Sequence, residues 1–86
     1  MWIIELSFTP AAERLAARPA HRVLLTQLHE QGVVKTAGPF ADDSGALIVL
    51  DAPDRETVDD VIAADPYFRT EGVTIAAVRE WSPILT

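Results

Sequence analysis

Few side chains in the sequence could do chemistry, and two of them, His21 and Asp65, stand out by their surroundings. His21 falls on the apolar stripe of one predicted helix, whereas Asp65 follows the apolar stripe of another and precedes Pro66. A carboxylate that is bonded to one ring nitrogen of a histidine fixes the tautomer and leaves the other nitrogen to take or give a proton near neutral pH. If folding brings the two residues together, they form a candidate general acid/base pair.

Each residue also has a purely structural interpretation. A lone histidine near the start of a helix is more often a packed or capping side chain than a catalyst. Asp65 is equally explained as a helix stop whose side chain begins a turn before Pro66. The residue types alone therefore leave both alternatives open.

Other kinds of functional site lack a pattern. His21 and His29 are eight residues apart, roughly 12 Å along a helix axis, so they cannot hold one metal ion as an i, i+4 pair would. Neither Gly38 nor Gly45 opens a helix in a phosphate-binding loop, and no serine stands in a glycine-flanked elbow. We therefore expect no metal and no cofactor.

Composition favours a small soluble protein with a thin core. The chain has 86 residues, no cysteine, 7 Lys+Arg, 13 Asp+Glu and a net charge of -6. We expect one domain over residues 1–86, no nucleic-acid partner, and a cytoplasmic location without signal peptide or membrane anchor. A core this thin favours self-association.

Periodicity and turn residues predict the secondary structure. Proline and glycine mark the breaks, with Pro19 in the first turn of the first helix and Gly32 after its end. We expect a loose helical turn capped by Thr9 over Ala11–Ala17, helices over Ala20–Gln31 and Asp54–Ala64, and strands over Trp2–Phe8, Val33–Phe40, Gly45–Ala52 and Val73–Trp81.

This order of elements is typical of one α+β fold, the ferredoxin-like split βαβ (βαββαβ). Its four-stranded antiparallel sheet carries both helices on one face, because the crossovers are right-handed. The third and fourth strands have apolar residues on both sides, such as Leu47 and Ile48. We therefore expect the bare face to be covered by a second sheet, in a homodimer.

Strand directions in this fold predict where His21 and Asp65 lie. The start of the first helix and the end of the second share one end of the sheet, together with the hairpin turn Ala41–Ser44. His21 and Asp65 should therefore meet there, beside an apolar pocket that would bind a small molecule.

Several local strings together resemble the YCII-related (YciI-like) family, nearly over the whole chain and in order. The strings are Arg18-Pro19-Ala20-His21, Leu28-His29-Glu30-Gln31-Gly32, Thr36-Ala37-Gly38-Pro39, Ala64-Asp65-Pro66-Tyr67 and Glu71-Gly72-Val73.

The resemblance implies a protomer of the dimeric α+β barrel type and an active-site His–Asp pair at His21 and Asp65. The family includes a cofactor-free lyase that eliminates chloride from a chlorinated hydroxyhydroquinone. The short hairpin turn of this chain departs from longer relatives. The residues that we expect to form the substrate pocket are Phe8, Arg18, Gly38, Pro39, Phe40, Pro66 and Tyr67.

Three functions compete at this point. The first is a cofactor-independent lyase or isomerase that moves a proton on a small cyclic or aromatic-type substrate. The second is a non-catalytic small-ligand-binding or accessory module, in which the pair only ties the helices together. Peroxidase-like or monooxygenase-like chemistry is the weakest, since no residue pattern suggests a heme ligand. The sequence identifies neither the substrate nor a role for His29.

Overall fold

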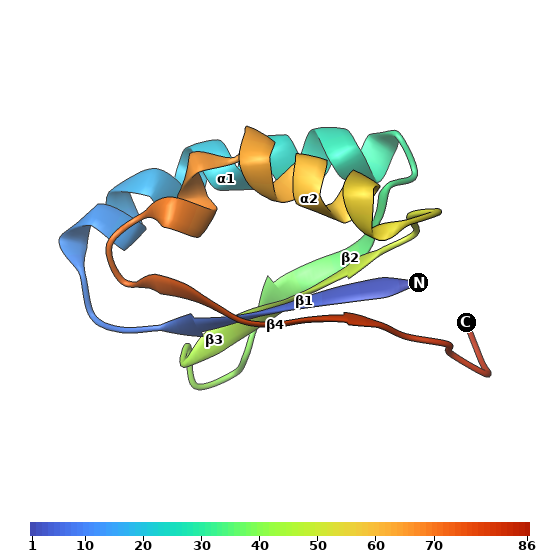
Figure 1. Cartoon of the computed structure of the whole chain (residues 1–86). Helices are drawn as coiled ribbons and strands as arrows, with labels where there is room; N and C mark the ends of the chain where they lie inside the picture. Colours follow the sequence, from blue (N-terminus) through green and yellow to red (C-terminus); the bar gives the residue numbers. More distant parts are fainter.

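The computed structural model describes all 86 residues, and its helices lie together on one side of a four-stranded sheet (Figure 1). The elements in chain order are β1 (Trp2–Phe8), α1 (Ala12–Glu30), β2 (Val34–Pro39), β3 (Gly45–Leu50), α2 (Arg55–Ala64), the short 3-10 helix η1 (Pro66–Arg69) and β4 (Val73–Glu80).

The sheet has the strand order β2-β3-β1-β4, and each neighbouring pair is antiparallel. Ile4 at the centre of β1 pairs with Ile48 of β3 on one side and Val78 of β4 on the other. This topology confirms the predicted α+β, βαββαβ fold with two main helices on one face.

Alternation along the central strands places the core between the sheet and the helices. Ile4 and Leu6 of β1, and Ile48 and Leu50 of β3, are fully buried beneath the helices. Val58 of α2 joins the same cluster. Full burial of one such side chain contributes about 1.5–3 kcal/mol, so this cluster supplies much of the free energy that fixes the helices on the sheet.

The first helix differs from the sequence prediction, because it runs unbroken from Ala12 and contains Pro19 in its interior. The residues before Pro19 are mostly strong helix formers, and their contribution outweighs the backbone hydrogen bond that a proline cannot donate. Thr9 does not cap this helix; its N–H donates to the carbonyl of Gly72 (2.9 Å). His21 therefore lies near the middle of α1 rather than at its start.

The segment after α2 holds a short helix that the sequence reading did not predict. Pro66 stands at the first position of η1, and the guanidinium of Arg69 folds back to donate to the carbonyls of Ile62 (3.1 Å) and Ala63 (3.2 Å). These bonds satisfy carbonyls that the end of α2 leaves free. As a result η1 packs against α1, and its Tyr67 and Phe68 side chains are buried.

The other face of the sheet carries no helix. Val49 on this face is buried within the single chain, whereas Glu5 and Arg79 are exposed. The C-terminal segment leaves the end of β4 and extends away from the helices (Figure 1). Its Trp81, Ile84 and Leu85 side chains are exposed. None of the helices has the length and apolar content that a membrane crossing requires.

Candidate active site

His21 and Asp65, which are 44 residues apart in sequence, form a direct side-chain hydrogen bond. The distance from His21 Nδ1 to Asp65 Oδ2 is 2.5 Å. Both residues are nearly closed to solvent, at 7% and 5% exposed. With the carboxylate ionised, Nδ1–H is the donor, and this arrangement leaves the proton-accepting lone pair of the neutral ring on Nε2.

Local structure holds the Asp65 carboxylate in place. Asp65 ends α2 because the following Pro66 disfavours helical geometry, and its Oδ1 accepts a hydrogen bond from the Tyr67 N–H (3.0 Å). One oxygen thus begins the turn into η1 while the other binds His21. The structural interpretation of Asp65 and its pairing with His21 are therefore both correct.

Two aromatic rings fix the plane of the His21 imidazole. The Tyr67 ring stacks on it with a centroid distance of 4.0 Å and an interplanar angle of 12°, and Phe68 meets it edge-on at 5.7 Å. The rings also exclude water from the His–Asp bond, and a drier environment strengthens this electrostatic contact.

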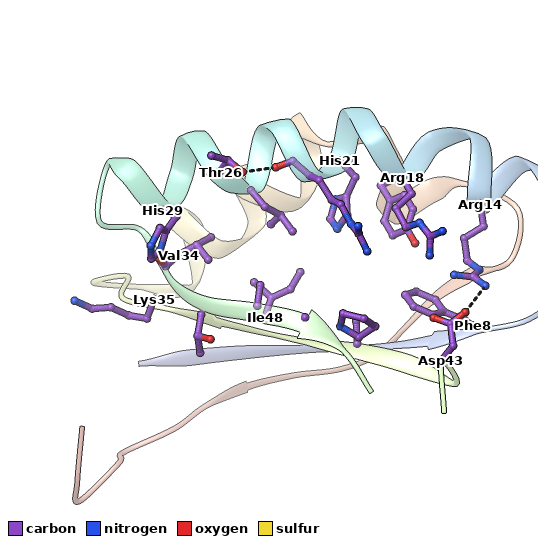
Figure 2. Close-up of a pocket in the computed structure, with 18 residues that line it drawn as sticks. Phe8, Arg14, Arg18, His21, Thr26, His29, Val34, Lys35, Asp43 and Ile48 are labelled. Carbon is purple, nitrogen blue, oxygen red and sulfur yellow. Dashed lines mark hydrogen bonds and ion pairs between the residues drawn. The ribbon is translucent and has the colours of Figure 1, made fainter. Parts of the chain in front are cut away.

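A cavity of about 480 Å³ lies between α1 and the strands β2 and β3, and His21 forms part of its wall. Figure 2 shows Arg14, Arg18, His21 and His29 descending from α1 toward the sheet. The volume is within the range of small-molecule sites, roughly 300–1,000 Å³. The expected pocket residues that line this cavity are Phe8, Arg18, Gly38, Pro39 and Tyr67.

Phe40 and Pro66, which the sequence reading also assigned to the pocket, do not line this cavity. Pro39 pairs with Ala46, and both face the cavity. Phe40 comes directly after the last residue of β2, and its side chain is exposed outside the cavity wall. Pro66 occupies the exposed first position of η1, where its ring ends α2 instead of reaching the cavity.

Arg14 lines the cavity but was missed by the sequence reading. Its Nη2 donates to Asp43 Oδ2 (3.2 Å), and its guanidinium lies 4.4 Å from the centroid of the Phe8 ring. Burial disfavours the charged guanidinium, but the nearby Tyr67 hydroxyl and the Asp43 carboxylate stabilise it, so that the pKa of Arg14 is raised above its ordinary value.

A helix that begins at Ala12 would have revealed Arg14. Arg14, Arg18 and His21 follow the i, i+4, i+7 spacing of one helix face. The signal is therefore present in the run of helix-forming residues before Pro19.

His29 also lines the cavity, in the last turn of α1. Its Nδ1 is 2.8 Å from the carbonyl oxygen of Val34, which can only accept, so Nδ1–H is the donor. His29 is more exposed than His21. No three His, Asp or Glu side chains converge in a way that could hold a metal ion.

Comparison with protein families agrees with the resemblance drawn from the sequence. The YCII-related domain matches residues 1–82. The chain belongs to the YCII-related domain family. Comparison with curated protein sequences gives no match.

Among solved structures, the chain is similar to the 5-chloro-2-hydroxyhydroquinone dehydrochlorinase (TftG) from Burkholderia phenoliruptrix AC1100, which was solved in complex with 2,5-dihydroxybenzoquinone. The TM-score is 0.62 at 15% sequence identity, and the match covers 95% of this chain and 94% of that chain. The YCII-related chain and the dehydrochlorinase thus share a fold over almost their whole lengths.

Proposed function

We propose that this YCII-related protein is a small cofactor-independent enzyme of the lyase or isomerase kind. His21 would move a proton on a small cyclic or aromatic-type substrate that occupies the cavity beside α1. The observation that carries the proposal is the buried bond from His21 Nδ1 to Asp65 Oδ2, which reserves Nε2 as a proton acceptor in the wall of that cavity.

The chemistry follows from this tautomer. Nε2 takes a proton from an acidic C–H bond of the substrate, and the bonding electron pair stays on the substrate as an enolate or carbanion. In a lyase this pair expels a leaving group, whereas in an isomerase it receives the proton back from Nε2 at another carbon. The imidazolium formed between these steps is stabilised by the Asp65 carboxylate.

The likeness to the dehydrochlorinase supports the choice of ligands to test. That protein is named for loss of chloride from a ring compound and was solved with a quinone. The cavity of this chain has aromatic walls, including Phe8 and Tyr67, that suit a flat ring. Phenolic, lactone and chlorinated ring compounds are therefore the first compounds to screen.

The competing proposal is a ligand-binding or accessory module in which the His–Asp pair is structural. The hydrogen bond from the Tyr67 N–H to Asp65 favours this alternative, because it gives the carboxylate a structural role that requires no catalysis. Both proposals expect ligands to raise the melting temperature, since binding to the native state stabilises it. Only the enzyme proposal expects turnover that depends on His21.

The deciding experiment is a thermal-shift screen followed by turnover assays of the compounds that bind. His21→Ala serves as the control in the screen, and His21→Gln is compared with wild type in the assays. We expect His21→Gln to lower the rate by about 10²–10⁴-fold in a folded sample. Unchanged rates would leave His21 a structural role and favour the binding module.

We also propose that the protein is a homodimer formed through the helix-free faces of two sheets. This proposal is supported by the apolar residues Leu47, Val49 and Ala77 on that face and by the thin core of one chain. Light scattering at micromolar concentration should give the mass of two chains or a multiple of it. A monodisperse monomer would contradict the proposal.

A further inference from the structure

The charges around the cavity are distributed unlike those of the rest of the chain. The whole sequence has 7 Lys+Arg against 13 Asp+Glu. Four of these cations line the cavity, whereas Asp43 is the only acidic residue in its wall. A cleft lined by one sign of charge attracts ligands of the opposite sign, because its low-dielectric walls concentrate the field. The cations are Arg14, Arg18, Arg22 and Lys35.

Arg14 is the one cation of the four that has buried donors without a partner. It is only 6% exposed, yet its Nε and Nη1 have no hydrogen-bond partner. Its one acidic partner, Asp43, has a side chain that is 50% exposed and stands in the hairpin turn. Buried guanidinium groups normally have all their donors engaged. Two donors of Arg14 are not, although the Asp43 carboxylate and the Tyr67 hydroxyl lie near its guanidinium.

We propose that the cavity binds its ligand as a planar oxyanion, a carboxylate or phenolate on a flat ring, and that Arg14 binds the negatively charged oxygen. This inference rests on the proposed function, which places a ligand in the cavity, and it adds that the ligand is negatively charged. A guanidinium fork matches such oxygens geometrically, and Arg14 lines the cavity with two donors that the protein leaves unpaired.

The placement of Arg14 relative to His21 fits this assignment. The two residues are seven positions apart on one face of α1, about 10 Å along the axis, and Arg18 lies between them. Phe8 lies under Arg14, and Tyr67 stacks on His21. A ring whose charged oxygen contacts Arg14 therefore extends along aromatic walls toward His21.

The test compares ligands of the same shape and different charge. Benzoate is matched by neutral benzamide, and 4-nitrophenolate at mildly alkaline pH is matched by 4-nitroaniline. Calorimetry on the full chain should show that at least one anion binds about ten- to a hundredfold more tightly than its neutral match, the range for a hydrogen bond to a charged group. The two pairs distinguish a carboxylate from a phenolate.

Three variants assign the effect to residues. Arg14→Met keeps the volume and removes the charge, so the preference should fall to within about threefold. Asp43→Asn removes the competing carboxylate and should strengthen anion binding severalfold. Arg22→Gln, on the exposed rim of the cavity, should change the preference less than Arg14→Met does. If Arg14→Met fails to fold, the wild-type Nε–H signal of Arg14 in NMR spectra should shift with the anion and not with its neutral match.

Several results would overturn the inference. They are equal affinity for anions and neutral ligands, no binding of either anion at millimolar concentration, and a preference that survives in Arg14→Met. Turnover that depends on His21 with no charge preference would keep the proposed function and refute this inference. An anion preference that depends on Arg14, without turnover that depends on His21, would keep this inference and refute the proposed enzyme function.

Discussion

The two histidines of α1 line the same cavity but have different partners, and this difference separates a candidate catalyst from a neighbour. His21, in the middle of the helix, is buried and bound to the carboxylate of Asp65. His29, near the end, is more exposed and bound to the backbone carbonyl of Val34. In both residues Nδ1–H is the donor, so the tautomer is the same.

The partner decides what happens when the ring gains a proton. A carboxylate carries a full negative charge that stabilises the imidazolium, whereas a carbonyl offers only a dipole. Burial between Tyr67 and Phe68 strengthens the interaction at His21, and the exposed position of His29 weakens its bond. The comparison teaches that lining the cavity does not by itself make a histidine a candidate base, because the charge of its partner also differs.

The largest effect should come from removing the charge behind His21. Asp65→Asn keeps the shape of the side chain but loses the negative charge and can favour the wrong tautomer of His21. We expect kcat to fall by about 10²–10⁴-fold once a substrate is known. His29→Gln, assayed on the same substrate, should change kcat by less than about tenfold. Equal losses in the two variants would abolish the distinction between the two histidines.

The next effect is on stability. Asp65→Ala leaves two buried donors, His21 Nδ1–H and the Tyr67 N–H, without their partner. Each unsatisfied buried group costs roughly 1–3 kcal/mol, so we expect a loss of about 3 kcal/mol in the free energy of unfolding. Urea unfolding followed by circular dichroism measures this loss. A loss below about 1 kcal/mol would show that water replaces the carboxylate, and that the site is wetter than its burial indicates.

A smaller effect is expected at the other histidine. His29→Gln removes one partly buried hydrogen bond to the Val34 carbonyl. The free energy of unfolding should fall by about 1 kcal/mol, the net value of an ordinary hydrogen bond. The same urea experiment applies, with Thr26→Ala as the control, because it removes an exposed hydrogen bond within α1. A loss as large as that of Asp65→Ala would show that the His29 hydrogen bond contributes as much to stability as the Asp65 carboxylate does.

The smallest effect should come from Asp54, the exposed counterpart of Asp65 at the other end of α2. Its carboxylate accepts hydrogen bonds from the Thr57 N–H (2.9 Å) and hydroxyl (2.8 Å), and these bonds hold the pKa of Asp54 below its ordinary value of 3.8. A lowered pKa in the folded state stabilises the protein above the unfolded value and is lost as the pH falls through the folded value.

We therefore expect Asp54→Ala to be slightly less stable than wild type at neutral pH. The difference should stay constant down to about pH 4, the unfolded value, and shrink below it. Urea unfolding across this range measures it. A difference that grows in acid would mean that Asp54 acts through some contact other than the cap.

Much of the fold follows from local signals that the sequence displays. Alternation in β1 and β3, the turn between β2 and β3, and the Asp54 cap each depend on residues within a few positions of one another. The predicted start of the first helix was wrong because proline is common in the first turn of a helix, whereas here the residues before Pro19 also favour a helix and continue it back to Ala12. η1 was not predicted because its helical turn depends on the Asp65 side chain and on the packing of Tyr67 and Phe68 against His21 of α1.

The sequence by itself determined the order of the elements, the end of α2 at Pro66 and the presence of a histidine and a carboxylate suited to proton transfer, since these depend on backbone preference and apolar periodicity. Only the tertiary structure decided that Arg14 is buried with unpaired donors and that Phe40 lies outside the cavity wall. Those outcomes depend on the register between α1, η1 and the sheet. Packing of many residues sets that register together, so no short stretch of sequence contains it.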